Sequence, residues 1–240
     1  MRKIIFLISV MCLWCMPYGM QARTIKDIFL SEPGYLMPLL SKSAKMDMID
    51  YLSVGQMADV NNALGKGTHF NKVTDSYMSV HISNGSTVEL LLMPISKRDT
   101  IVVAVTTFSL PAKDSRIEFF TTDWKRYVRT KTFMKEPTMK DFISIPKGDK
   151  TKKETVLAAI DFPVIQYRIN PDNNTIIATH SLKEYMSKDD YEKIAPYLRE
   201  SLEYKFKNGI FSMSKFPINW SVVLISATGS IVASLIPCLF

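Results

Sequence analysis

The sequence has 240 residues, a formal net charge of +7 and three cysteines, and these values exclude several classes of protein. The basic residues are scattered, and two acidic residues and a glycine interrupt the densest run, over 147–154. The chain therefore lacks the continuous basic face of a nucleic-acid-binding protein, and we expect no nucleic-acid partner. Cys12, Cys15 and Cys238 lie in the two apolar ends, so the body has no internal disulfide, thiol nucleophile or cysteine-based metal site.

Residues 1–22 are typical of a cleavable secretory signal peptide. Two basic residues precede an apolar run over 4–16, and turn-forming residues then lead to Ala22, after which we expect cleavage. The run is shorter than the roughly 20 residues that a membrane-spanning helix needs. An uncleaved anchor and a buried N-terminal helix are the alternatives. The sequence therefore predicts export to the periplasm or the cell surface.

The opposite end, residues 216–240, is an apolar tail without a charged residue. Its length is that of a membrane-spanning helix. Gly229, Pro237 and four serines dilute its hydrophobicity, however, and basic residues precede it while none follows, which opposes the orientation that export would impose. Three interpretations stay open: a membrane-associated tail, an atypical end that adds nothing to the fold, and an element packed on the body.

Two helices and four strands are predicted in the first half of the body. Thr24 and Asp27 form a capping-box pattern that begins a short helix, and apolar residues at helical spacing predict a second helix from about Ser43 to Leu52. Strands are predicted over 77–82, 88–92, 101–105 and 116–121. Asn84-Gly85 is typical of a hairpin turn between the first two. The first strand should have one buried and one wetter face, and the third, apolar on both faces, should be central.

The second half repeats this pattern on a smaller scale. Its predicted elements are a helix over 152–159 and strands over 164–169, 175–179, 202–206 and 210–213. Ser187 and Asp190 form a second capping box, and Pro196 should break the helix that follows. The closing hairpin is predicted to turn at Asn208-Gly209.

Strands that follow one another through hairpins, without alternating with helices, favour an antiparallel sheet. The sequence therefore predicts an α+β fold, a mainly antiparallel sheet of hairpin-linked strands with helices packed on one face. We predict a single domain over 23–215. The charged run near 147–153 is the alternative boundary between two halves.

The first half also resembles a known family. The segments that carry the resemblance are Met46–Tyr51, Val60–Gly65, Leu90–Pro94 and Pro111–Trp124. Over about residues 24–213 the chain is similar to an uncharacterised secreted family of Bacteroidales, a domain-of-unknown-function family. The resemblance implies export from a Gram-negative anaerobe and brings no established activity or catalytic residue. Members of that family end near the position of Phe211, so the apolar tail departs from it.

No cofactor or metal site is predicted. Residues 65–68 resemble the end of a phosphate-binding loop, but Val60 stands where the first glycine of that loop is required, so we interpret the segment as a turn. His69, His81 and His180 are far apart and lack metal-binding spacing. The acids Asp114, Asp123 and Asp172 could form a carboxylate pair only if the fold brought them together.

An aromatic and basic group around the fourth strand is the candidate binding site. Phe119 should face the core, Phe120 should lie on the opposite face, and Trp124 follows the strand. Aromatic side chains beside basic groups are typical of surfaces that bind proteins or glycans, although they are also ordinary strand-to-loop packing. The predicted binding residues are Phe120, Trp124, Lys125, Arg126, Asp114 and Arg116.

Three classes of function remain open. The leading hypothesis is a non-catalytic periplasmic or cell-surface interaction module that binds a protein or a glycan. A hydrolase with an unrecognised site would require two of Asp114, Asp123, His81 and His180 to converge in a cleft. The third hypothesis is an envelope-assembly or inhibitor-like structural protein.

Overall fold

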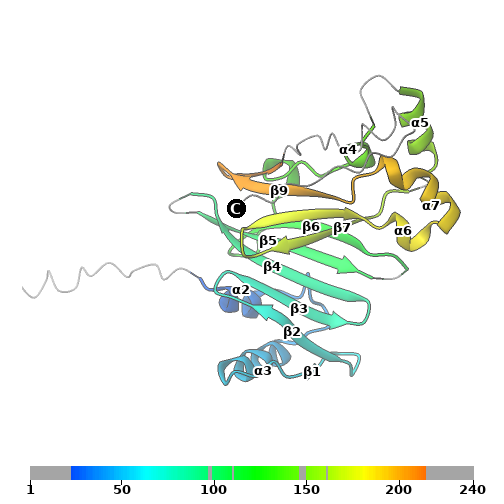
Figure 1. Ribbon diagram of the computed structural model, residues 1–240. Coiled ribbons are helices and arrows are strands. Elements are labelled where there is room, and N and C mark those ends of the chain that lie inside the picture. Colours follow the sequence, from blue (N-terminus) through cyan, green and yellow to red (C-terminus); the bar gives the residue numbers. More distant parts are fainter. Residues whose placement is uncertain (1–22, 97–98, 110, 146–149, 161, 215–240) are drawn as a thin grey trace, which may run out of the picture.

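The computed structural model describes residues 23–96, 99–109, 111–145, 150–160 and 162–214. They form two antiparallel sheets and several short helices, which confirms the predicted α+β class (Figure 1). The predicted signal peptide and the predicted apolar tail lie outside the described residues. No helix within the described ranges is long and apolar enough to cross a membrane.

The larger sheet contains six strands, in which spatial neighbours are also neighbours in the chain. They are β1 (Val60–Asn61), β2 (Gly67–Val73), β3 (Tyr77–Ser83), β4 (Ser86–Pro94), β5 (Thr100–Phe108) and β6 (Asp114–Thr121). The last four confirm the predicted strands. β5 lies between β4 and β6, and residues 101–105 are at most 1% exposed, as expected for a strand that is apolar on both faces.

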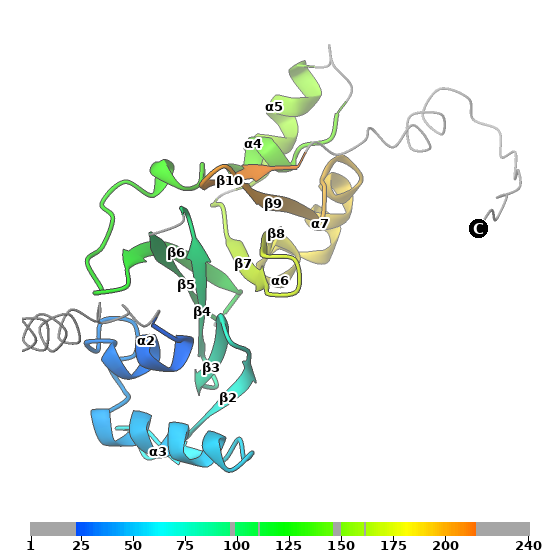
Figure 2. The ribbon, with the colours of Figure 1, turned by 90° about the vertical axis from the view of Figure 1, so that its left-hand side faces the viewer.

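Helices α2 (Ile25–Ser31) and α3 (Lys42–Ser53) cover one face of this sheet (Figure 2). The predicted capping box is present, because Thr24 Oγ1 accepts a hydrogen bond from the backbone amide of Asp27 and the Asp27 carboxylate accepts one from the backbone amide of Thr24. Buried side chains of both helices pack on alternate residues of the strands, among them Met78, Val80 and Leu90.

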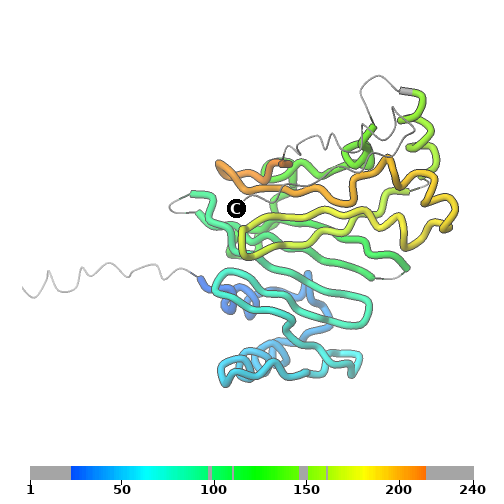
Figure 3. Tube along the Cα trace, in the orientation of Figure 1, coloured from blue at the N-terminus to red at the C-terminus, as the bar shows by residue number. Residues whose placement is uncertain are grey.

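The smaller sheet contains four strands in the order β10-β9-β8-β7 and packs on the opposite face of the larger one (Figure 2). These strands are β7 (Ile165–Asn170), β8 (Thr175–His180), β9 (Ser201–Lys207) and β10 (Ile210–Met213). The shared core includes Leu91, Val103 and Phe119 from the larger sheet. Figure 3 shows the chain passing from the larger sheet, in cyan and green, to the smaller one, in yellow and orange.

Short helices surround the smaller sheet. They are η1 (Thr130–Thr132), α4 (Met139–Phe142), α5 (Lys150–Ala158), α6 (Leu182–Tyr185), α7 (Lys188–Ile194) and η2 (Ala195–Tyr197). α5 and α7 confirm two predicted helices. The predicted break occurs as expected, since α7 ends at Ile194 and Pro196 lies in the separate turn η2. Asn208 and Gly209 both have positive φ (53° and 83°), the backbone conformation that a tight hairpin turn requires.

Two expectations about the larger sheet need correction. The second face of β3 is wetter only at its end: Tyr77 and Ser79 are 4% and 6% exposed, because the smaller sheet covers them, whereas His81 is partly exposed. The segment after Gly65 is not only a turn, because β2 begins at Gly67 and pairs with β3. The strand was not predicted because only Thr68 and Phe70 are buried in it, and its other residues are mostly polar.

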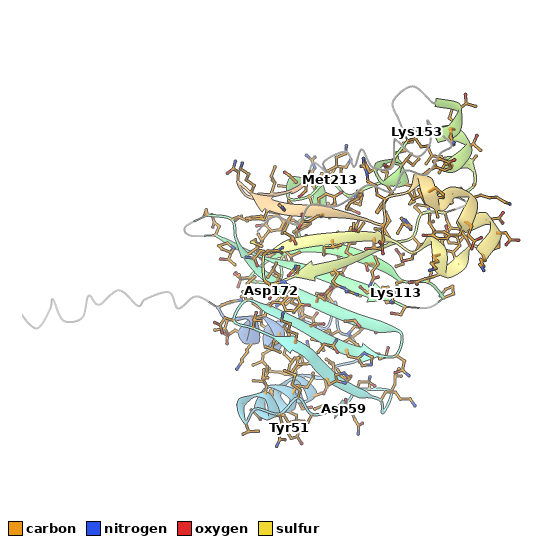
Figure 4. All side chains as sticks on the ribbon, viewed as in Figure 1. Tyr51, Asp59, Lys113, Lys153, Asp172 and Met213 are labelled. Atoms are coloured by element: carbon orange, nitrogen blue, oxygen red, sulfur yellow. The ribbon has the colours of Figure 1, made fainter. Side chains whose placement is uncertain are left out.

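Two polar contacts accompany the packing of the two sheets. Asp172, labelled in Figure 4, lies in the turn between β7 and β8, and its carboxylate is 3.2 Å from Nζ of Lys72 on β2. This exposed pair adds little stability. The second contact is buried on the core side of β4: Tyr77 Oη donates a 2.5 Å hydrogen bond to Glu89 Oε1.

Burial raises the pKa of Glu89 above its ordinary value of 4.5, although the hydrogen bonds from Tyr77 and from the backbone of Ile169 act in the opposite direction. The folded state therefore binds this proton more tightly than the unfolded state does. Glu89 consequently lowers stability as the pH rises above 4.5, and this penalty is complete above its folded-state pKa.

Replacing Glu89 with Gln should therefore raise the melting temperature at pH 8, because the amide oxygen can still accept the bond from Tyr77 while the buried charge is gone. The difference between Glu89→Gln and the unmodified protein should vanish below about pH 4, near the unfolded-state pKa. Melting curves across this range test the expectation. If the melting temperature of the variant minus that of the unmodified protein were lower at pH 8 than at pH 4, the expectation would be contradicted.

Candidate functional site

The candidate site begins on β6, the edge strand of the larger sheet. Side chains alternate along a strand, so Arg116 and Glu118 share the face of β6 that lies on the side of α2. Glu118 is buried, 4% exposed, and Arg116 Nη2 lies 2.9 Å from Glu118 Oε1. A buried carboxylate requires a charged or hydrogen-bonding partner, and Arg116 supplies one.

Two further side chains converge on the same carboxylate. Arg126 Nε lies 3.1 Å from Glu118 Oε1, and the hydroxyl of Tyr35 donates to that oxygen at 3.1 Å. The Tyr35 oxygen accepts hydrogen bonds from Arg116 Nη2 at 3.0 Å and from Arg126 Nη1 at 3.1 Å. We call Tyr35, Arg116, Glu118 and Arg126 the arginine–tyrosine cluster.

A turn holds Arg126 at this position. After β6 the chain reverses, the backbone amide of Thr121 donates to the carbonyl of Lys125, and Phe120 forms an isolated antiparallel bridge with Arg126. Trp124 occupies the reversal with a φ of 62°, a left-handed conformation that is uncommon for a bulky residue. The turn thus sets the second arginine beside the first.

The charge of the cluster is not balanced. Two guanidinium groups face one carboxylate, and the side chains of Arg116 and Arg126 are 54% and 47% exposed. Among the described residues, Nε and Nη1 of Arg116 and Nη2 of Arg126 have no hydrogen-bond partner. The cluster can therefore donate further hydrogen bonds to an anionic group, and arginine is well suited to bind a carboxylate in this way.

An apolar cavity of about 290 Å³ adjoins the cluster. Its lining includes Tyr35, Leu36, Pro38, Leu39, Ile82, Ser86, Val88, Thr106, Phe108, Arg116 and Glu118. Phe108 and Tyr35 are 53% and 48% exposed, so two aromatic side chains remain accessible at this site. An apolar hollow beside a few polar groups is the usual composition of a ligand site.

Phe120, one of the predicted binding residues, is 2% exposed and packs in the core on the side of α2. Trp124 is partly buried: its ring lies 5.3 Å from that of Phe120, and Nε1 donates to Ser31 Oγ at 3.2 Å. The aromatic pair thus supports the turn and the cluster from within. Tyr35, whose ring lies 6.0 Å from Phe120, reaches the surface.

The other predicted binding residues have separate surroundings. Lys125 is exposed, and its backbone rather than its side chain makes the described contacts. Asp114, at the opposite end of β6, lines a different cavity of about 420 Å³. The structure therefore brings together Arg116 and Arg126 from the predicted set and leaves Asp114 apart.

The residues required for the hydrolase hypothesis have different neighbours. Asp123 pairs with Arg23 at 2.7 Å, and the ring of His81 stacks on that of His69 at 4.8 Å. His180 is buried beside Phe142, and burial lowers its pKa. Within the described ranges, no group of three histidine, cysteine, aspartate or glutamate side chains could hold a metal ion.

Sequence reasoning missed three residues of this site. Tyr35 follows a turn at Gly34 and has no pattern that connects it to β6. Glu118 was hidden because a buried carboxylate looks like a solvent-facing residue in an alternating strand. Phe108 lies at the end of β5, where an exposed aromatic residue cannot be distinguished from a core residue by periodicity.

The chain is thus an α+β protein that carries the partly exposed arginine–tyrosine cluster at the edge of its larger sheet. Residues 18–211 match the family described as protein of unknown function (DUF3256), and the chain belongs to this family. The match ends at Phe211, before the apolar tail.

A domain of an uncharacterized protein from Porphyromonas gingivalis W83 has a similar structure. The identity is 22%, the TM-score is 0.69, and the similarity covers 79% of this chain and 97% of that chain. At this identity the similarity shows the fold alone. No curated protein matches the sequence.

Proposed function

We propose that the chain is an exported, non-catalytic interaction module that binds a protein partner through the arginine–tyrosine cluster and the adjoining cavity. The observation that carries the proposal is the unbalanced charge: two half-exposed guanidinium groups retain free donors beside an apolar hollow. Arginine and tyrosine are also the residues that most often dominate binding energy at protein interfaces.

The lining of the cavity favours a protein over a glycan. Leu36, Leu39, Ile82 and Val88 offer aliphatic surface, which suits an apolar side chain and would leave sugar hydroxyl groups without partners. The free donors of Arg116 suit a carboxylate nearby. The partner should therefore present an aspartate or glutamate next to an apolar residue.

Export is part of the same proposal. The signal-peptide pattern over 1–22 and the resemblance to a secreted family of Bacteroidales both support it. The partner would then be a component of the periplasm or the cell surface, and residues 216–240 could add membrane association.

Selection of random peptides displayed on phage against the full chain tests the proposal. Enriched peptides should pair an acidic with an apolar residue, and Phe108→Ala should weaken their binding about tenfold, the equivalent of 1.4 kcal/mol. Phe162 is similarly exposed, at 51%, so Phe162→Ala is the matched control and should leave binding unchanged. Enrichment of peptides without acidic residues, or recognition of an acidic glycan array in their place, would contradict a protein partner of this chemistry.

A further inference from the structure

The cavity that contains Asp114 is a second site, separate from the arginine–tyrosine cluster. It lies between the start of β6, residues 136–140, the end of α5 and the start of β7. Lys113, labelled in Figure 4, immediately precedes Asp114 and lies in the hairpin between β5 and β6. The volume of about 420 Å³ is within the range of small-ligand sites.

Two carboxylates line this cavity. Asp114 Oδ1 accepts a 3.0 Å hydrogen bond from the backbone amide of Ser115, and Glu136 Oε1 accepts a 2.8 Å bond from Thr130 Oγ1. Neither carboxylate forms a salt bridge within the described part of the chain, and the second oxygen of each is unused there. The exposed Lys140 is the one described basic residue in the lining, so the net charge of the lining is negative.

Tyr167 adds a hydrogen-bonding group to this cavity. The residue is 4% exposed and lines the cavity, and its hydroxyl has no hydrogen-bond partner among the described residues. The fully buried side-chain atoms without a partner in the described part of the chain are His180 Nδ1 and Tyr204 Oη, so the Tyr167 hydroxyl is accessible and can bond to a ligand. Burial raises the pKa of Tyr167, and the nearby carboxylates of Glu136 and Asp114 raise it further. The phenol therefore stays protonated.

The remaining wall is aliphatic. Three partly exposed aliphatic residues line the cavity: Leu157 on α5, Ile160 just after α5, and Ile165 on β7. Such a surface can hold a hydrocarbon chain whose burial contributes about 0.8 kcal/mol for each methylene group. The cavity thus combines an apolar floor with oxygen atoms that can accept hydrogen bonds.

We propose that this cavity binds an organic cation, a primary ammonium or guanidinium group carried on an aliphatic chain. The cation would lie between the carboxylates of Asp114 and Glu136 and donate a hydrogen bond to the Tyr167 oxygen. Its aliphatic chain would pack on Leu157 and Ile165. A lysine or arginine side chain of a polypeptide and a free alkylamine share this chemistry.

Titration of the full chain with hexylammonium, hexanol and hexanoate, followed by NMR, tests the proposal. Hexylammonium should bind most tightly, hexanol about tenfold more weakly, and hexanoate not measurably, because only the cation gains the charge-assisted bonds. The double variant Asp114→Asn/Glu136→Gln should reduce the affinity for hexylammonium at least tenfold. Asp172→Asn removes an exposed carboxylate elsewhere and should have no effect.

Tyr167→Phe keeps the ring in the core and should reduce the affinity for hexylammonium without lowering the melting temperature, since the hydroxyl has no partner to lose. If an amide-blocked lysine peptide binds more tightly than hexylammonium, the source of the cation is a polypeptide. If hexylammonium binds more tightly, the source is a free amine. Equal binding of hexanoate and hexylammonium, or an unchanged affinity in the double variant, would overturn the proposal. Neither result bears on the arginine–tyrosine cluster.

Discussion

Replacing Lys45 with Met is expected to lower the free energy of unfolding by about 3–5 kcal/mol. Lys45 lies on the buried face of α3, and its side chain is 3% exposed. Its Nζ lies 2.6 Å from Glu32 Oε2 and donates a 2.8 Å hydrogen bond to the Glu32 carbonyl. The variant leaves the carboxylate of Glu32, which is fully buried, without its counter-charge.

The large effect should come from the isolated charge and not from lost packing, because methionine fills a similar volume. Glu32 Oε1 also accepts the backbone amide of Leu36, a bond that glutamine can preserve. The double variant Lys45→Met/Glu32→Gln should therefore recover most of the stability that Lys45→Met loses. Urea denaturation of the four proteins measures the coupling. Additive losses in the double variant would show that the pair is not the cause.

Replacing Phe119 with Ala is expected to cost about 3–5 kcal/mol, through lost burial and the cavity that the ring leaves. Phe119 is fully buried between the two sheets. Its ring lies 5.2 Å from that of Phe133 and 6.4 Å from that of Phe211 on β10. The ring therefore contacts side chains from both parts of the shared core.

Hydrogen exchange of this variant also tests the predicted single domain over 23–215. If the two sheets unfold as one unit, amides of β4 and of β8 should lose the same protection in Phe119→Ala, since both then exchange through global unfolding. Phe162→Ala removes an exposed ring, and its effect on stability should stay below about 1 kcal/mol. Full protection of β8 with loss in β4 would favour two halves that meet near 147–153.

Local signals in the sequence predicted most of the elements correctly. Capping residues such as Thr24 act on backbone amides a few positions away, and the Asn208-Gly209 turn depends on the φ values of two residues, so both can be recognised without the tertiary structure. The break after Ile194 follows from the missing amide hydrogen of Pro196 in the same local way.

Long-range contacts determine what sequence reasoning missed. The burial of Lys45 has no local signal, because its partner Glu32 lies on a different segment. Tyr77 on the face of β3 that was expected to be wetter is buried, because the smaller sheet, which begins at Ile165, covers it. At the site, Arg116 and Arg126 were predicted, but Tyr35 and Glu118 join them only through the fold.

A double-mutant cycle measures the proposed contact between Arg116 and a carboxylate of the protein partner. The binding free energy of a selected peptide and of its Asp→Asn or Glu→Gln analogue is compared between the unmodified protein and Arg116→Gln. Arg126 remains paired with Glu118 in that variant, so the buried carboxylate keeps a counter-charge. We expect a coupling energy of about 1.5–3 kcal/mol, the range for a hydrogen bond to a charged group. Additive effects, with a coupling energy near zero, would contradict the proposed function.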